Sequence, residues 1–134
     1  MQGKPGESLS LSDRIGVVEE AYEFMLAYAA QGHPRGNEGE HIRDFLGKAD
    51  EALHGLATTA RDAVRAAGAI EASFSPFIDV LDSDVTKARA GIALALGQRA
   101  INSQIIDNLN ASIHLRALLT DLFLIDEALA SSTT

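Results

Sequence analysis

The stretch from Ala111 to Ala130 constrains the fold more strongly than any other part of the chain. If it is one α-helix, each residue advances about 100° around the axis, and its apolar side chains then fall on two separate faces. The first face consists of Ile113, Ala117, Leu124 and Ala128. The second, nearly opposite face consists of Leu115, Leu118, Leu122, Ile125 and Leu129. A helix that is apolar on both sides has to be covered on both sides.

These two faces predict self-association. We expect one face to pack inside the monomer and the other to meet a second copy of the chain, most simply across a two-fold axis. The second face, from Leu115 to Leu129, is assigned to this subunit interface. The alternative is that the helix lies centrally in an irregular bundle, where the same chain covers both faces.

The composition favours a single helical domain. The chain has 134 residues, a length typical of one domain. Nineteen acidic against eleven basic residues give a net charge of −8, so nucleic acids and anionic membrane surfaces are not expected as partners. The absence of cysteine excludes disulfides and thiolate metal sites. Without a signal peptide or an apolar run of about 18 residues, we expect a cytoplasmic protein.

Helical periodicity runs through most of the chain. We expect a first helix that begins at Ser10 or Ser12 and ends at Gly32, and a second helix over 37–67 after a Gly- and Pro-containing loop. Capping-box spacing is found for Ser10 with Asp13 and for Asn37 with Glu40.

The sequence offers two possible starts and two possible ends for the third helix. It begins either at Ser75, with Pro76 at its first position, or near Asp82. It ends either at Gly97 or at Asn108–Asn110, and we place the turn at Asn108–Asn110. The last helix then extends to about residue 130.

Four amphipathic helices joined by short connections predict an all-α, four-helix up-down-up-down bundle that self-associates through its C-terminal helix. This domain covers residues 10–130. Residues 1–9 and 131–134 are expected to be disordered tails.

A metal site is the main alternative interpretation. Glu51 and His54 form a Glu-x-x-His pair, the ligand unit of ferritin-like di-iron bundles, and Glu20 is a candidate partner carboxylate. If Leu53 points to the core, however, both members of the pair point away from it. They are then solvated surface residues, unless an oligomer buries them and they hold iron or another divalent metal.

A second polar pattern consists of Asp107, His114 and Asp121, which are spaced by seven residues. On one continuous helix they lie within about 40° of one another, between the two apolar faces. Asp and His in such a stripe are suited to divalent metal binding or proton exchange. The simpler interpretation is a solvated rim, and a turn at Asn108–Asn110 would remove Asp107 from the stripe.

The sequence contains no arrangement typical of a catalytic site. We therefore expect a non-enzymatic interaction or accessory protein without a cofactor, which acts as a homo-oligomer and binds a further, unidentified protein. The alternatives are the ferritin-like metal-binding protein and a small-ligand sensor with a pocket near Tyr22 and Tyr28.

Overall fold

The computed structural model describes residues 9–31 and 38–132. In these residues the protein is all-α, as predicted, with six helices and no strand. The helices are α1 (Leu11–Gln31), α2 (Glu38–Leu53), α3 (Leu56–Ala66), α4 (Glu71–Leu96), α5 (Ser103–Ala111) and α6 (Ile113–Ser132).

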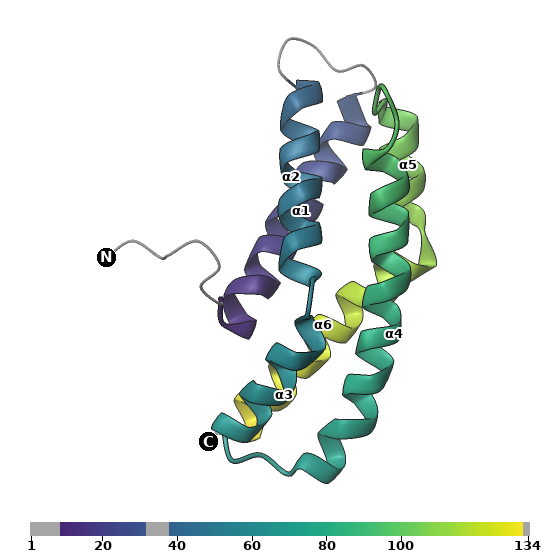
Figure 1. Cartoon of the computed structure of the whole chain (residues 1–134). Helices are drawn as coiled ribbons and strands as arrows, with labels where there is room; N and C mark the ends of the chain where they lie inside the picture. Colours follow the sequence, from purple (N-terminus) through teal and green to yellow (C-terminus); the bar gives the residue numbers. More distant parts are fainter. Residues whose placement is uncertain (1–8, 32–37, 133–134) are drawn as a thin grey trace, which may run out of the picture.

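The longest helix, α4, runs along the whole molecule (Figure 1). One half of α4 lies beside α2 and α5, and the other half lies beside α3 and α6 (Figure 1). In agreement with this arrangement, α4 packs against α2, α3, α5 and α6, whereas α1 packs mainly against α2 and α5.

Two of the expected long helices are each divided into two. The helix predicted over 37–67 breaks at Gly55, whose φ of 70° is left-handed and interrupts the helical hydrogen bonding between α2 and α3. Near the C-terminus the chain breaks twice, at Gly97 after α4 and at Ser112 between α5 and α6. The single turn predicted at Asn108–Asn110 is therefore wrong, because both of these residues lie within α5.

The ends of several helices have side-chain caps. The predicted capping box is present: the Asp13 N–H donates to Ser10 Oγ (3.0 Å), and the Ser10 N–H donates to Asp13 Oδ2 (3.4 Å). Asn102 caps α5 by accepting from the Ile105 N–H (2.9 Å). The predicted Asn37–Glu40 pair lies outside the residues whose side chains are described.

The start of α4 also differs from the prediction. The helix begins at Glu71, before either expected start, and Pro76 lies inside it. Proline removes one hydrogen bond near the helix start, and this loss does not end the helix.

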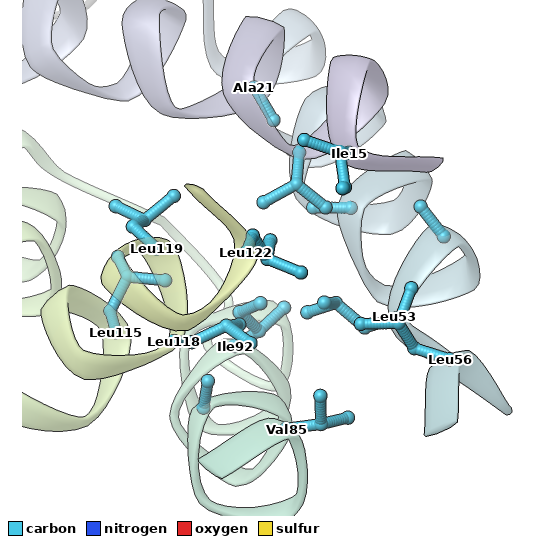
Figure 2. Close-up of a cluster of buried hydrophobic side chains, with 14 of the residues drawn as sticks. Ile15, Ala21, Leu53, Leu56, Val85, Ile92, Leu115, Leu118, Leu119 and Leu122 are labelled. Carbon is cyan, nitrogen blue, oxygen red and sulfur yellow. The ribbon is translucent and has the colours of Figure 1, made fainter. Parts of the chain in front are cut away.

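The core is built from apolar side chains of every helix. Figure 2 shows a part of it to which α1, α2, α3, α4 and α6 contribute, with Leu118 and Leu122 of α6 among the labelled residues. Of the face that we assigned to a second subunit, Leu115, Leu118, Leu122 and Ile125 are buried in the chain itself, and Leu129 is partly buried. These residues are thus covered from within the monomer by the packing of α6 on α4, α5 and α1.

Candidate functional site

The residues predicted to hold a metal are not brought together. Glu20 of α1, Glu51 of α2 and His54 at the end of α2 are all exposed. No three His, Cys, Asp or Glu residues of the described chain are grouped so that they could hold a metal ion. Within one chain, these side chains therefore do not form the ligand set that the Glu-x-x-His spacing suggested.

His54 instead belongs to a polar cluster that joins α2 to α4. The Arg89 guanidinium donates to both carboxylate oxygens of Asp50, at 2.8 and 3.2 Å, and to His54 Nδ1 at 3.1 Å. The hydrogen bond to Asp50 raises the pKa of Arg89 further. A two-pronged Arg–carboxylate contact fixes orientation as well as distance, so this cluster positions the α2 terminus against α4.

The predicted stripe of Asp107, His114 and Asp121 is divided by the helix break at Ser112. Asp107 lies on α5 and His114 near the start of α6, and both are exposed. Asp121 is buried on α6. The structure therefore does not form one continuous stripe from the three residues.

Asp121 faces a carboxyl group that the sequence analysis missed, Asp84 of α4. Burial, and after it the neighbouring Asp84 carboxyl, raise the pKa of Asp121 to about 7. Asp121 Oδ2 is buried and has no hydrogen-bond partner among the described residues. The position of Asp121 between Leu118 and Ile125 at helical spacing was a sequence indication that it faces inward.

The other apolar side of α6 is the one left open, and we call it the outer face: Ile113, Ala117, Leu124 and Ala128. Ile113 is 73% exposed and Leu124 is 55% exposed. Ala117 and Ala128 are partly exposed. Next to this face is a groove of about 450 Å³ between α4 and α6, lined in part by Phe77, Leu124 and Ala128.

A second hollow, the α1–α5 pocket, lies between α1, α5 and the start of α6. It has a volume of about 370 Å³ and is lined by Tyr22, Leu26, Ala29, Ala30, Asp107, Asn110, Ala111 and Arg116. Tyr22, one of the two tyrosines predicted to lie near a pocket, thus lines it. Tyr28 does not; it is buried, and its hydroxyl donates to the Ile101 carbonyl.

Comparison of the chain with protein-family models, curated proteins and solved structures found no match. Among the described helices, none is both long and apolar enough to cross a membrane.

Proposed function

We propose that this protein is a self-associating interaction protein whose copies meet through the outer face of α6. The observation that supports this proposal is the exposure of Ile113 and Leu124 on one side of a helix whose other side is buried. Large apolar side chains that are exposed on one face of a helix indicate a surface that a protein partner can cover. The outer face of a second copy is complementary to this surface.

The outer face alternates large and small residues in a symmetric order. Positions 113 and 128 are equidistant from a point between residues 120 and 121, and so are positions 117 and 124. In an antiparallel pair of α6 helices with a two-fold axis at that point, Ile113 of one copy lies opposite Ala128 of the other. Ala117 likewise lies opposite Leu124. Each large side chain thus meets a small one, as close helix packing requires.

The groove between α4 and α6 extends this apolar surface. Phe77 of α4 lines the groove together with Leu124 and Ala128. Val80, one turn after Phe77 on α4, is 49% exposed. A second copy seated along α6 would cover apolar side chains of both helices, which adds to the favourable burial in the dimer.

The first test changes the centre of the outer face. We expect the native chain to form a dimer with twice the 14.2 kDa mass of the monomer, and Leu124→Glu to be monomeric because a carboxylate would be buried against Ala117 of the partner. Light scattering after size exclusion gives the mass, and circular dichroism checks folding. Leu94→Glu is the matched control, because Leu94 is an exposed leucine of α4 outside this face. A monomeric native chain, or a dimeric Leu124→Glu variant, would refute the proposal.

A residue exchange tests the antiparallel geometry itself. Ala117→Leu places two leucines opposite each other, and Leu124→Ala places two alanines opposite each other. Each single change should raise the dimer Kd at least about tenfold. The double variant restores one large residue opposite one small residue and should dimerise more tightly than either single variant. Sedimentation equilibrium gives the free energy of dimerisation of each variant. If the losses caused by the two single changes simply add in the double variant, positions 117 and 124 are not paired across the interface.

A further inference from the structure

We infer that, in the dimer proposed above, α4 packs antiparallel on α4 of the second copy, with Asp84 of each copy paired to Lys87 of the other. This inference rests on the proposed function and names a second contact of the same interface. Two observations support it: the order of side chains along one side of α4, and the place where α4 meets α6.

One side of α4 carries a stripe of residues at alternating spacings of three and four. Its members are Val80, Asp84, Lys87 and Gly91, which follow Phe77 of the groove. This spacing keeps side chains on one side of a helix and is typical of the contact between two paired helices. Lys87 is exposed, Val80 is 49% exposed, and the other two members are partly exposed. The stripe is therefore a surface that a second helix can cover.

The centre of this stripe carries charges that are not paired within one chain. Asp84 lies beside the buried Asp121 of α6, and neither carboxyl forms an ion pair with a cation of the described chain. Lys87, one turn after Asp84, likewise forms no ion pair within the described ranges 9–31 and 38–132. A lysine from a second copy would therefore neutralise negative charge at the point where α4 meets α6.

The order of the stripe is complementary to itself when it is reversed. Positions 84 and 87 are equidistant from a point between residues 85 and 86, and so are positions 80 and 91. In an antiparallel pair of α4 helices with a two-fold axis at that point, Asp84 of each copy lies opposite Lys87 of the other. Val80 lies opposite Gly91, which has no side chain. The dimer thus gains two ion pairs, each next to a contact between a large and a small residue.

The two-fold axis inferred for α4 can be the same as the one proposed for α6. The axis between residues 120 and 121 passes next to Asp121, and the axis between residues 85 and 86 passes close to Asp84. Because these two side chains lie beside each other in the structure, one axis can cross both helices and bring each onto its own copy. Packed helices diverge away from their crossing point, so Leu94, about 13 Å along α4 from the axis, is outside this contact.

The experiment reverses the charge of Lys87. Lys87→Glu places a carboxylate opposite Asp84 of the other copy, twice in each dimer, and should raise the dimer Kd at least about tenfold in sedimentation equilibrium. Lys48→Glu is the matched control, because Lys48 is an exposed lysine of α2 outside the interface, and it should leave the Kd unchanged. Circular dichroism checks that both variants fold. A Lys87→Glu variant that dimerises as tightly as the native chain would overturn the inference.

A mixture of two variants tests the pairing of positions 84 and 87. Asp84→Lys, like Lys87→Glu, places like charges opposite each other, so each variant alone should dimerise weakly. In an equimolar mixture both contacts of the mixed dimer join opposite charges, so its Kd should be at least about tenfold lower than that of either variant alone. Native mass spectrometry with one variant isotopically labelled identifies the mixed dimer. If the mixed dimer is no tighter than the two homodimers, Asp84 and Lys87 do not pair across the axis.

Failure of the α4 pairing is distinguishable from failure of the dimer proposal. A native dimer that Leu124→Glu makes monomeric, but whose Kd Lys87→Glu leaves unchanged, would overturn only the α4 pairing. A native chain that is monomeric would refute the dimer itself, and the α4 pairing with it.

Discussion

At the residue scale, the buried carboxyl of Asp121, which lies beside Asp84, makes the stability of the fold depend on pH. Asp121 is buried on α6 beside Asp84 of α4, and its pKa is raised from the usual value of 3.8 to about 7. The folded state therefore binds a proton more tightly than the unfolded state does. The stabilisation from this proton is fully present below pH 3.8 and is lost as the pH rises through about 7.

This linkage predicts the effect of Asp121→Asn. The amide is isosteric and uncharged, and it can donate to Asp84, so the variant avoids burying a second negative charge. At pH 8 the free energy of unfolding should rise by about 1–3 kcal/mol, whereas at pH 4 it should change little. Urea unfolding followed by circular dichroism at the two pH values measures both quantities.

The matched control is Asp126→Asn, an exposed aspartate on the same helix. This change should have very little effect on the difference in the free energy of unfolding between pH 4 and pH 8, because an exposed carboxyl interacts weakly with its surroundings. If Asp121→Asn destabilises the protein at pH 8, the conclusion that Asp121 binds a proton more tightly in the folded state is wrong.

At the scale of the secondary-structure elements, the breaks between helices set the directions of the helix axes. Gly55 is exposed and adopts φ 70° between α2 and α3. A side chain in this conformation crowds the following carbonyl, which makes glycine the favoured residue. By contrast, Gly47 lies inside α2, where an added Cβ would meet no atom within 4 Å apart from the backbone of the helix itself.

The two glycines should respond to alanine with opposite signs. Gly55→Ala should lower the free energy of unfolding by about 1–2 kcal/mol, because alanine is strained at positive φ. Gly47→Ala should raise it by about 0.5–1 kcal/mol, because alanine is the better helix former. Chemical unfolding of both variants beside the native chain provides the measurement. A stabilising Gly55→Ala change would mean that α2 and α3 form one continuous helix.

At the scale of the whole molecule, two arginines join distant helix ends. Arg43 of α2 donates to the Leu96 carbonyl (3.0 Å) at the end of α4 and to the Arg99 carbonyl (2.9 Å) just beyond it. Arg14 of α1 donates to the Ala52 and His54 carbonyls at the end of α2 (3.0 and 2.9 Å). The C-terminal end of a helix leaves carbonyls without partners and carries partial negative charge, so a guanidinium there is favourable.

We therefore expect Arg43→Met to lower the free energy of unfolding by about 1.5–3 kcal/mol, the range for hydrogen bonds to charged groups. Arg61→Met is the control, since the Arg61–Asp79 ion pair (2.9 Å) is on the surface and should contribute less than about 1 kcal/mol. Thermal and urea unfolding of the two variants test this difference. If both variants lose the same free energy of unfolding, Arg43 does not fix the end of α4.

Much of the local structure could be predicted from residue patterns. The all-α class follows from helical periodicity, and the start of α1 follows from the capping box of Ser10 and Asp13. The break at Gly55 was harder to predict, because glycine within an otherwise periodic helix is often tolerated. Near the C-terminus we treated Gly97 and Asn108–Asn110 as alternatives, whereas the chain breaks at Gly97 and again at Ser112.

The candidate sites depended on contacts between distant residues. Asp121 is perturbed by Asp84 of another helix, and the orientation of Asn110 is fixed by the Met25 carbonyl of α1. The Glu51–His54 spacing is local, yet the remaining ligands of a metal site would have to come from other helices. No periodicity within one helix reports which side chain of a neighbouring helix lies opposite.

The sequence by itself determined that this protein is helical, because backbone hydrogen bonding and apolar spacing are local properties. It also determined that the last helix has two apolar faces. Only the tertiary structure decided which face is inside: Leu118 and Leu122 are buried, whereas Ile113 and Leu124 stay exposed. The physical reason is that the two faces are similarly apolar, so burial follows from where α1, α4 and α5 lie, which depends on the packing of the whole chain.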